Sequence, residues 1–420
     1  MPDNFLNLHI LVTTSVANMN RDDTGAPKQV TYGGATRHRM SSQAMTRAKR
    51  VAYETSGDGD QVTWRAKSGM IDKAELMASD LADQNGQALT EQEAVRLRVL
   101  LATGVNALVI NRDKALKAAT ERAKAKAVRD AKSPTVPTDS LAGGGEGTES
   151  DAGEDTGKKD TLVWLAEHEL RDLVQQSLSA VRDGTEPGEF VNTKGRTQSL
   201  TIAAFGRMFA FRPDLQNEAA VQRSHAFTTH AADIEPDYFT AVNDLPQLSE
   251  GSGAGHLDLN QFGGGVFYWH ANIDRDQLWS SWITGQDDAR TRQRLTGFFE
   301  ALILALPSGK KATTAAKTVP DAVLVVPARS PVALHQAFEA PIRAGQDGYR
   351  SRSLQALLDA HDSVRRFAPR QFTAPAQLAG TLPLAPNEQI TVQPSLDALI
   401  EACVDWMMAG QPTSDAAAVG

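Results

Sequence analysis

The pattern of hydrophobic positions along the chain predicts alternating strands and helices. Four stretches have the apolar residues and the short length of buried strands: residues 5–16, 199–211, 266–273 and 322–328. Three stretches repeat apolar residues at helical spacing: residues 71–131, 161–181 and 290–306. This mixture predicts an α+β protein.

Within the first helical stretch, a Thr90-x-x-Glu93 capping box is followed by an apolar periodic run, which predicts a helix start. Residues 114–132 are alanine-rich and carry mixed charge, so we expect an exposed helix there. Residues 133–160 consist largely of Pro, Ser, Thr, Gly and acidic residues, with no large apolar residue after Leu141. That composition predicts a disordered acidic loop.

Residues 37–53 place five cations around the start of a predicted helix. On a helical wheel, an apolar face contains Met45, Ala48 and Val51, while Arg47 and Arg50 lie on the polar face with Lys49 at its edge. Ser41 or Ser42 can cap the helix. Cations in the first two turns oppose the helix dipole, and an external anion such as phosphate would resolve that conflict. A solvated basic surface explains the same pattern equally well.

Residues 226–262 form a long polar connection with little periodicity. Connections of this length inside a domain are usually functional or disordered. Tyr238, Phe239 and Val242 give this one apolar anchors, so we expect an ordered protrusion.

Composition narrows the class of protein. The chain has 420 residues, 43 basic and 51 acidic, with a net charge of −8. Between Thr24 and Tyr53, however, it has six cations and no acidic residue, so the local field suits a polyanion. Cys403 is the single cysteine, which excludes an intramolecular disulfide and a multi-cysteine zinc site. With no signal peptide or membrane-length apolar run, we expect a soluble, cytoplasmic protein without membrane partners.

Enzymatic motifs are largely missing. The sequence has no His-Glu-x-x-His, Walker or Gly-x-Ser-x-Gly motif, and its nine histidines are dispersed. We therefore expect no metal and no cofactor. Asp22 and Asp23 are the acidic pair near the basic run; they could hold Mg²⁺ or polarise a ribose hydroxyl, but fixing the loop is the favoured role.

Several motifs in order resemble the CasC family, the backbone subunit of the type I-E CRISPR surveillance complex Cascade. They are Phe5-Leu-Asn-Leu-His-Ile-Leu, Asn20-Arg-Asp-Asp, Gly33-Gly, Arg39-Met-Ser-Ser-Gln, Arg47-Ala-Lys-Arg, Gly206-Arg-Met, Thr228-Thr-His, Tyr238-Phe-Thr-Ala-Val, Gly264-Gly-Val-Phe-Tyr and Ala271-Asn-Ile. Each is weak alone, and the ordered set is specific.

The resemblance implies an RNA-recognition-motif-like, that is ferredoxin-like, palm with a large helical fingers insertion and a protruding thumb loop. By position, the palm comprises residues 1–60, 190–225 and 263–420. The fingers comprise residues 61–189, with the disordered acidic loop at 133–160. The thumb comprises residues 226–262.

The resemblance also assigns residues to an RNA interface. Contacts to the guide RNA are implied for Asn20, Arg21, Lys28, Arg39, Ser41, Gln43, Arg47, Lys49, Arg50, Arg207, Met208 and Lys310. Arg207 and Met208 would lie at kinks of the guide, and Phe239, Thr240 and Val242 on the thumb. Thr46 stands where family members have Lys, which transfers one phosphate contact to Lys49 or removes it.

The function so implied is a non-catalytic subunit that oligomerises along the CRISPR RNA and presents it for pairing with double-stranded DNA in antiviral defence. Implied partners are CRISPR RNA, the target DNA strand, other copies of the chain, and the other Cascade subunits: the large subunit, the small subunits, the guide 5′-end subunit and the guide-processing endoribonuclease. Two alternatives stay open. One is an endoribonuclease backbone subunit of type III kind using Asp22 or Asp23, and the other is a free-standing RNA-binding protein.

Overall fold

The computed structural model describes residues 4–56, 62–66, 68–84, 89–110, 112–130, 162–185, 195–209, 211–232, 234–240, 257–285 and 287–411. The chain divides into two compact units. The sheet unit comprises Met1–Gly59, Leu200–Gly206 and Glu218–Gly420, and the helical unit comprises Asp60–Ser199 and Arg207–Asn217. The acidic segment predicted at 133–160 lies outside the described residues.

The sheet unit is built around β1 (Phe5–Ala17), which pairs antiparallel with β10 (Ala322–Ala328) and with β9 (Leu257–Asp274). β7 (Ala226–Thr228) pairs antiparallel with the other edge of β9. The four strands therefore lie in the order β10-β1-β9-β7. Helix α1 (Ser42–Ser56) follows β1, and helix α8 (Asp288–Leu304) connects β9 to β10. Two split β-α-β units with this strand order are the ferredoxin-like arrangement, and the predicted α+β fold class is confirmed.

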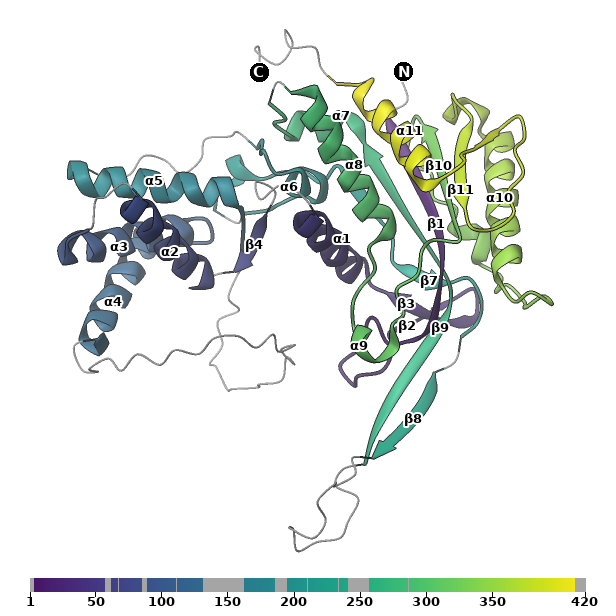
Figure 1. Ribbon diagram of the computed structural model, residues 1–420, viewed down its shortest axis with the longest axis horizontal. Coiled ribbons are helices and arrows are strands. Elements are labelled where there is room, and N and C mark those ends of the chain that lie inside the picture. The colour runs from purple at the N-terminus through teal and green to yellow at the C-terminus, as the bar shows by residue number, and fades with distance from the viewer. Residues whose placement is uncertain are drawn as a thin grey trace, which may run out of the picture. The chain divides into compact units, whose positions relative to one another are not determined.

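Both faces of this sheet are covered by helices (Figure 1). Helices α1 and α8 pack against each other on one face. Helix α10 (Arg350–Phe367) and the short helix η4 (His335–Phe338) pack on the other face, over Leu11, Tyr268 and Leu324. Because both faces are covered, β1 is buried along most of its length instead of alternating between core and solvent.

Smaller elements complete the sheet unit. Their bounds are β2 (Gln29–Tyr32), β3 (Ala35–Met40), α6 (Leu200–Phe205), β6 (Val221–Arg223), α7 (Arg275–Ser281), α9 (Lys311–Thr314), η5 (Pro369–Gln371), β11 (Ala376–Gly380), β12 (Ile390–Val392) and α11 (Leu396–Met408). β2 and β3 form a hairpin whose second strand pairs with β7, so the chain reaches α1 from the edge of the sheet.

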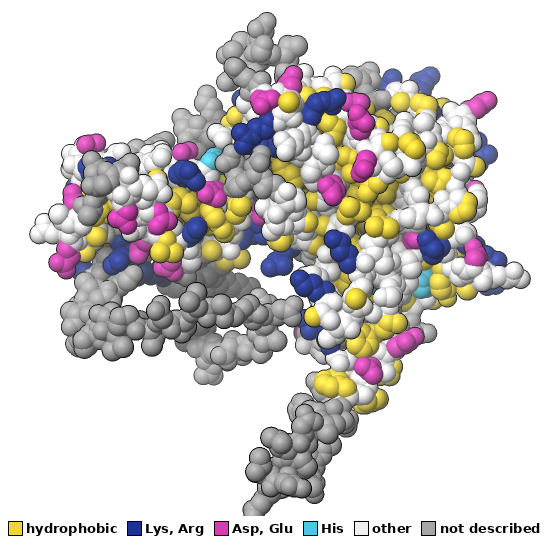
Figure 2. Space-filling view, in the orientation of Figure 1, with side chains coloured by type: hydrophobic (Ala, Val, Ile, Leu, Met, Phe, Trp, Pro, Cys, Tyr) yellow, Lys and Arg dark blue, Asp and Glu magenta, His cyan; other side chains and the backbone are white. Residues whose placement is uncertain are grey.

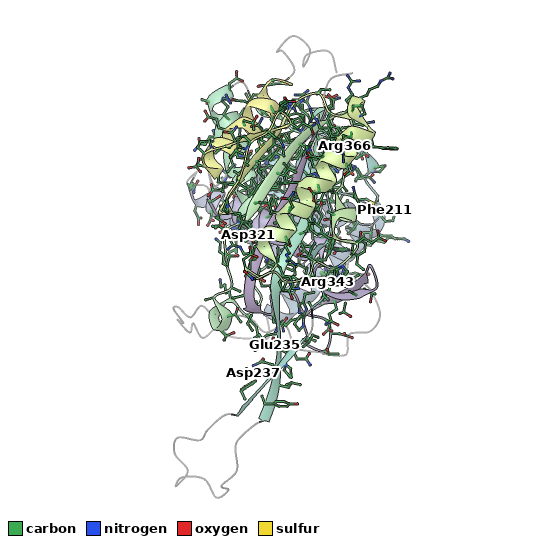
Figure 3. All side chains as sticks on the ribbon, turned by 90° about the vertical axis from the view of Figure 1, so that its right-hand side faces the viewer. Phe211, Glu235, Asp237, Asp321, Arg343 and Arg366 are labelled. Atoms are coloured by element: carbon green, nitrogen blue, oxygen red, sulfur yellow. The ribbon has the colours of Figure 1, made fainter. Side chains whose placement is uncertain are left out.

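A hairpin of β8 (Glu235–Thr240) and the first part of β9 projects from the sheet (Figures 1 and 3). This places an ordered protrusion within the connection predicted at 226–262. Gly263 and Gly265 lie where the hairpin leaves the sheet, and their missing side chains make room for two imidazole rings. A Cβ at Gly263 would lie 2.3 Å from His38 Nε2, and one at Gly265 would lie 2.2 Å from His230 Nε2.

The helical unit combines helices that pack against one another with a two-stranded sheet of β4 and β5. Its elements are β4 (Thr63–Ala66), α2 (Ser68–Gln84), α3 (Glu91–Ala107), α4 (Arg112–Asp130), β5 (Val163–Ala166), α5 (Glu167–Asp183) and η2 (Pro213–Leu215). The Thr90–Glu93 capping box is present at the start of α3, as the sequence predicts. Leu101, Val105 and Leu173 lie in the shared core.

Two predictions of secondary structure are wrong. Leu200–Phe205 forms the helix α6 instead of a strand, and all six of its residues are buried. A short, mostly apolar run has no periodicity that separates a buried strand from a buried helix. The stretch predicted as a helix from residue 161 begins with strand β5, and its helix starts only at Glu167.

Candidate nucleic-acid interface

The start of helix α1 is held by side chains from three segments. Ser41 is the N-cap, because its Oγ accepts a hydrogen bond from the amide of Ala44 at 3.2 Å. Asn20 Oδ1 accepts the Ser41 amide at 2.8 Å, and His225 Nδ1 accepts the Ser42 amide at 2.8 Å. Three amides of this helix start thus already have partners within the protein, so an external phosphate would depend mainly on side chains.

Helix α1 buries a different face from the one that the wheel predicts. Met45, Lys49 and Tyr53 are buried, whereas Val51 is exposed. Lys49 Nζ donates to the carbonyls of Leu302 and Ala305 at 2.7 and 3.1 Å, at the end of α8. It also lies 3.9 Å from the centre of the Trp269 ring.

Lys49 is therefore a core residue and not the predicted surface contact. Its side chain is only 1 % exposed, and burial, followed by the charge of Arg223, holds its pKa well below the ordinary value for lysine. Two helix-end carbonyls and an aromatic face satisfy the ammonium in place of a phosphate. Of the two alternatives for the phosphate contact expected where Thr46 stands, transfer to Lys49 is therefore disfavoured. Thr46 itself is buried and accepts a hydrogen bond from Arg223.

Two further cations of the basic run already have partners inside the protein. Arg37 is fully buried and donates to the carbonyls of Thr228, Phe338 and Glu339. Arg50 forms an ion pair with Glu54 at 2.8 Å, and its side chain is 13 % exposed. For the predicted contact with RNA, a phosphate would have to compete with the Glu54 carboxylate for the Arg50 guanidinium.

Four cations remain near the start of α1. Arg21 and Arg47 are exposed, and Lys28 and Arg39 are half-buried. None of the four forms an ion pair with a carboxylate in the described part of the chain. The predicted residue Gln43 is exposed one turn before Arg47, while Asn20 and Ser41 serve as partners of backbone amides. Lys and Arg side chains are visible around α1 and the neighbouring loops in Figure 2.

The loop that carries Arg21 is shaped by Asp22. Its Oδ1 accepts hydrogen bonds from the amides of Thr24 and Ala26 and from the Thr24 hydroxyl, at 2.8 to 3.0 Å. The Thr24 hydroxyl is the main reason that the pKa of Asp22 is lowered. This carboxylate closes the turn, in agreement with the favoured role.

In the helical unit, Arg207 is buried and pairs with Glu169. Nη1 of Arg207 lies 2.6 Å from Glu169 Oε2, and both side chains are at most 3 % exposed. Arg207 also exchanges two backbone hydrogen bonds with Asn217. The predicted contact of its guanidinium with RNA is corrected, because the charge is already neutralised inside the unit. The neighbouring Met208 points outward and is 80 % exposed.

The remaining predicted residues lie near the projecting hairpin or on it. Lys310 donates from Nζ to Asn260 Oδ1 and has a left-handed backbone with a φ of 52°. Phe239 is 42 % exposed on β8, Thr240 ends that strand, and Val242 lies outside the described residues. Glu235 and Asp237 are also exposed on this hairpin (Figure 3), which makes its stem acidic.

Sequence reasoning missed His225 and Arg223. Nothing in the spacing of His225 along the sequence ties it to a helix start 183 residues away. Arg223 lies in β6, where its guanidinium reaches Thr46 and the ring of Phe205.

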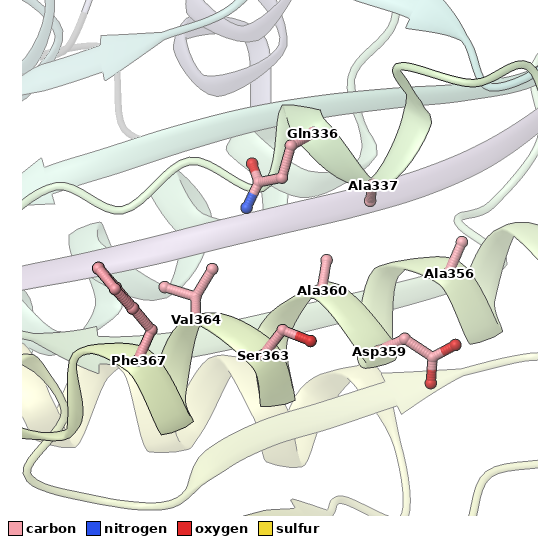
Figure 4. Close-up of a pocket in the computed structure, with 8 residues that line it drawn as sticks. All are labelled: Gln336, Ala337, Ala356, Asp359, Ala360, Ser363, Val364 and Phe367. Carbon is pink, nitrogen blue, oxygen red and sulfur yellow. The ribbon is translucent and has the colours of Figure 1, made fainter.

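A separate groove of about 540 Å³ lies between η4 and α10 (Figure 4). Ala337, Ala360, Val364 and the exposed Phe367 contribute to its walls. It is on the face of the sheet opposite α1.

Among the described residues, no group of three or more His, Cys, Asp or Glu side chains is arranged to hold a metal. None of the described helices is long and apolar enough to cross a membrane.

Comparisons with known proteins agree with the motifs in the sequence. A family model described as "CT1975-like protein" matches residues 6–402. A solved chain entitled "CRISPR RNA-guided surveillance complex, pre-nicking" is similar with 28% identity and a TM-score of 0.69, covering 96% of this chain and 100% of that one. Another, entitled "CRISPR RNA-guided surveillance complex", has 24% identity and a TM-score of 0.55, covering 96% and 99%, and shows likeness of fold. No curated protein matches the sequence.

Proposed function

Because the chain belongs to the CT1975-like family, whose members are CasC-like backbone subunits of CRISPR surveillance complexes, we propose that it is the guide-binding backbone subunit of a type I-E complex. In this proposal several copies line up along one CRISPR RNA. They hold its sugar-phosphate backbone and leave its bases available for pairing with the target strand of double-stranded DNA.

The observation that carries the proposal is the set of cations left without carboxylate partners around the start of α1. Arg21, Lys28, Arg39 and Arg47 are at least partly exposed, whereas Lys49 is buried on helix carbonyls. Lys and Arg side chains that neutralise phosphates supply most of the affinity for a nucleic acid regardless of its sequence. A subunit that has to accept any guide needs this kind of contact, since base pairing supplies the sequence specificity.

A non-catalytic role is part of the proposal. The Asp22 carboxylate is engaged in three hydrogen bonds that close its own turn, which supports a role in shaping the loop. The described residues also offer no cluster of carboxylates for two metal ions. We therefore favour RNA holding over RNA cleavage.

We further propose that the projecting hairpin contacts a neighbouring copy of the chain and the guide. Tyr238 and Phe239 are exposed apolar residues on β8 and supply a surface for such contacts. The remaining partners are the large and small subunits, the subunit at the 5′ end of the guide, the guide-processing endoribonuclease and the target strand.

Purification of the complex from its native host, followed by sequencing of the bound RNA, tests this function. We expect RNAs of uniform length that carry repeat-derived ends and diverse spacers, together with subunits of a type I-E complex. Limited nuclease digestion should give protected RNA with accessible positions at regular intervals. Recovery of the chain as a monomer with heterogeneous cellular RNA would contradict the proposal and favour a free-standing RNA-binding protein.

A further inference from the structure

His225 contacts the start of α1 close to two half-buried cations, Lys28 and Arg39. The residue lies between β6 and β7, and its imidazole is exposed. Nδ1 accepts the Ser42 amide at 2.8 Å. The ring is thus fixed at the helix start by one of its two nitrogens.

This hydrogen bond determines where the proton of the neutral ring lies. A ring nitrogen that accepts a hydrogen bond cannot carry the proton of a neutral imidazole, so the proton is on Nε2. Nε2 has no partner among the residues that the structure describes. His225 therefore holds an unused N–H donor on an exposed side chain.

The surroundings of the ring favour its neutral form. Partial burial, then the charge of Arg39, then that of Lys28 lower the pKa of His225. Protonation of Nδ1 would also break its bond with Ser42. The backbones of Lys28 and Arg39 are tied together, because the Arg39 amide donates to the Lys28 carbonyl at 2.7 Å and the Lys28 amide donates to the Asn20 carbonyl at 2.9 Å. A neutral donor and two cations are accordingly held on one framework.

We infer that His225 donates a hydrogen bond from Nε2 to a backbone oxygen of the RNA strand whose phosphates are bound by Lys28 and Arg39. The inference rests on the proposed function, and adds to it a contact that is neutral and directional. Such a contact orients the strand and adds affinity without adding charge. If His225 only accepted the Ser42 amide at the start of α1, its replacement would leave RNA binding unchanged.

The inference is tested with the full-length chain assembled on a labelled single-stranded guide RNA, by measuring RNA dissociation over a range of salt concentrations. His225→Phe removes both the acceptor and the donor; we expect about ten-fold weaker retention with an unchanged salt slope. His225→Gln can accept from Ser42 and donate to RNA, and should stay within about two-fold of the wild type. Lys28→Ala should lower the salt slope by about 0.7, as expected for one lost phosphate contact on a single strand.

The thermal unfolding midpoint of each variant separates binding from folding. If His225→Phe does not assemble, His225→Ala serves in its place, because water can then reach the Ser42 amide. The inference would be overturned if His225→Phe, or His225→Ala in its place, retained the RNA as well as the wild type. It would also be overturned if His225→Gln and His225→Phe lost RNA retention equally. A salt slope lowered by loss of His225 would also overturn it, since the contact would then be ionic. Unchanged binding in Lys28→Ala, Arg39→Ala and Arg47→Ala together would instead contradict the proposed function.

Discussion

At the scale of single residues, burial decides what each cation of the basic run does. Lys49 and Arg47 are two positions apart on α1, yet the first lies in the core and the second in solvent. Arg37 is also buried, on three carbonyls. The sequence predicts the local excess of positive charge but not which members reach the surface, because that depends on where β9 and α8 meet α1.

Lys49 should therefore matter for stability more than for RNA binding. Lys49→Met keeps an aliphatic stem but leaves the carbonyls of Leu302 and Ala305 without their donor and removes the cation from the face of Trp269. We expect a loss of about 2–4 kcal/mol in the free energy of unfolding. Urea denaturation of the chain without RNA measures it.

Arg47→Ala on the same helix is the matched control for Lys49→Met. Its side chain is exposed, so its free energy of unfolding should stay within about 0.5 kcal/mol of the wild type. Equal stability of the two variants would show that the buried ammonium does not hold α1 to α8.

Asp22 gives a prediction about catalysis. Asp22→Ala removes the acceptor that closes the turn from Asp22 to Ala26. We expect no cleavage of complementary RNA by the assembled complex with Mg²⁺, for the wild type and for the variant alike. Gel analysis that found regularly spaced fragments, lost on Asp22→Ala, would favour the endoribonuclease alternative.

At the scale of elements, the root of the projecting hairpin depends on two glycines packed against histidines. Gly263→Ala would place a methyl group against the buried ring of His38. We expect a loss of about 1–3 kcal/mol in the free energy of unfolding, as for an overpacked core. Gly297→Ala in α8 is a control in the same unit, since its Cβ would be 3.7 Å from Tyr53; helix propensity predicts a gain of about 0.5–1 kcal/mol. Equal effects of the two substitutions would refute this packing.

The face of the sheet under α10 contains three histidines whose pKa values are lowered in the folded state. His9 and His270 stack with ring centres 4.8 Å apart, and His335 lies near His270. Burial is the main cause of the lowered pKa of each, and the pKa of His270 falls to about 3. In the unfolded chain these histidines have the ordinary pKa of about 6.5, so below about pH 6.5 the unfolded chain binds more protons than the folded chain. The free energy of unfolding should therefore fall as the pH drops below that value.

Carboxylates also change the free energy of unfolding as the pH falls, and replacement of His270 separates the effect of the histidine from theirs. Between pH 7 and pH 5, the wild type should lose on the order of 2 kcal/mol more than His270→Gln. Urea midpoints at several pH values provide the measurement. Parallel curves for the two proteins would contradict the predicted linkage.

Sequence patterns predict the long elements of this fold and fail where tertiary packing decides. The strand at residues 5–16 and the Thr90 capping box are present as predicted. Leu200–Phe205 is helical although the sequence predicts a strand, because a mostly apolar run of six residues fits either type of element; Gly206 ends the helix with a φ of 75°. The helical wheel predicts the wrong face of α1, because the polar residue Lys49 occupies a core position. A pattern of hydrophobic residues cannot show this.

At the scale of the whole molecule, an acidic chain carries a local basic surface. The net charge is −8, while the basic run from Thr24 to Tyr53 contains no acidic residue. Acidic side chains such as Glu235 and Asp237 are exposed on the stem of the projecting hairpin. Since exposed charges are screened beyond about 8–10 Å at physiological salt, RNA at α1 responds mainly to the cations next to it.

The salt dependence of guide binding tests the central claim, that exposed and unpaired cations around α1 hold the RNA backbone. It should be measured for the wild type, Arg47→Ala, Arg50→Ala and Arg366→Ala, the last an exposed arginine on α10. We predict that the slope of log affinity against log salt falls by about 0.7 for Arg47→Ala only, because Arg50 is already paired with Glu54 and Arg366 is on the opposite face of the sheet. Four equal slopes would contradict the account.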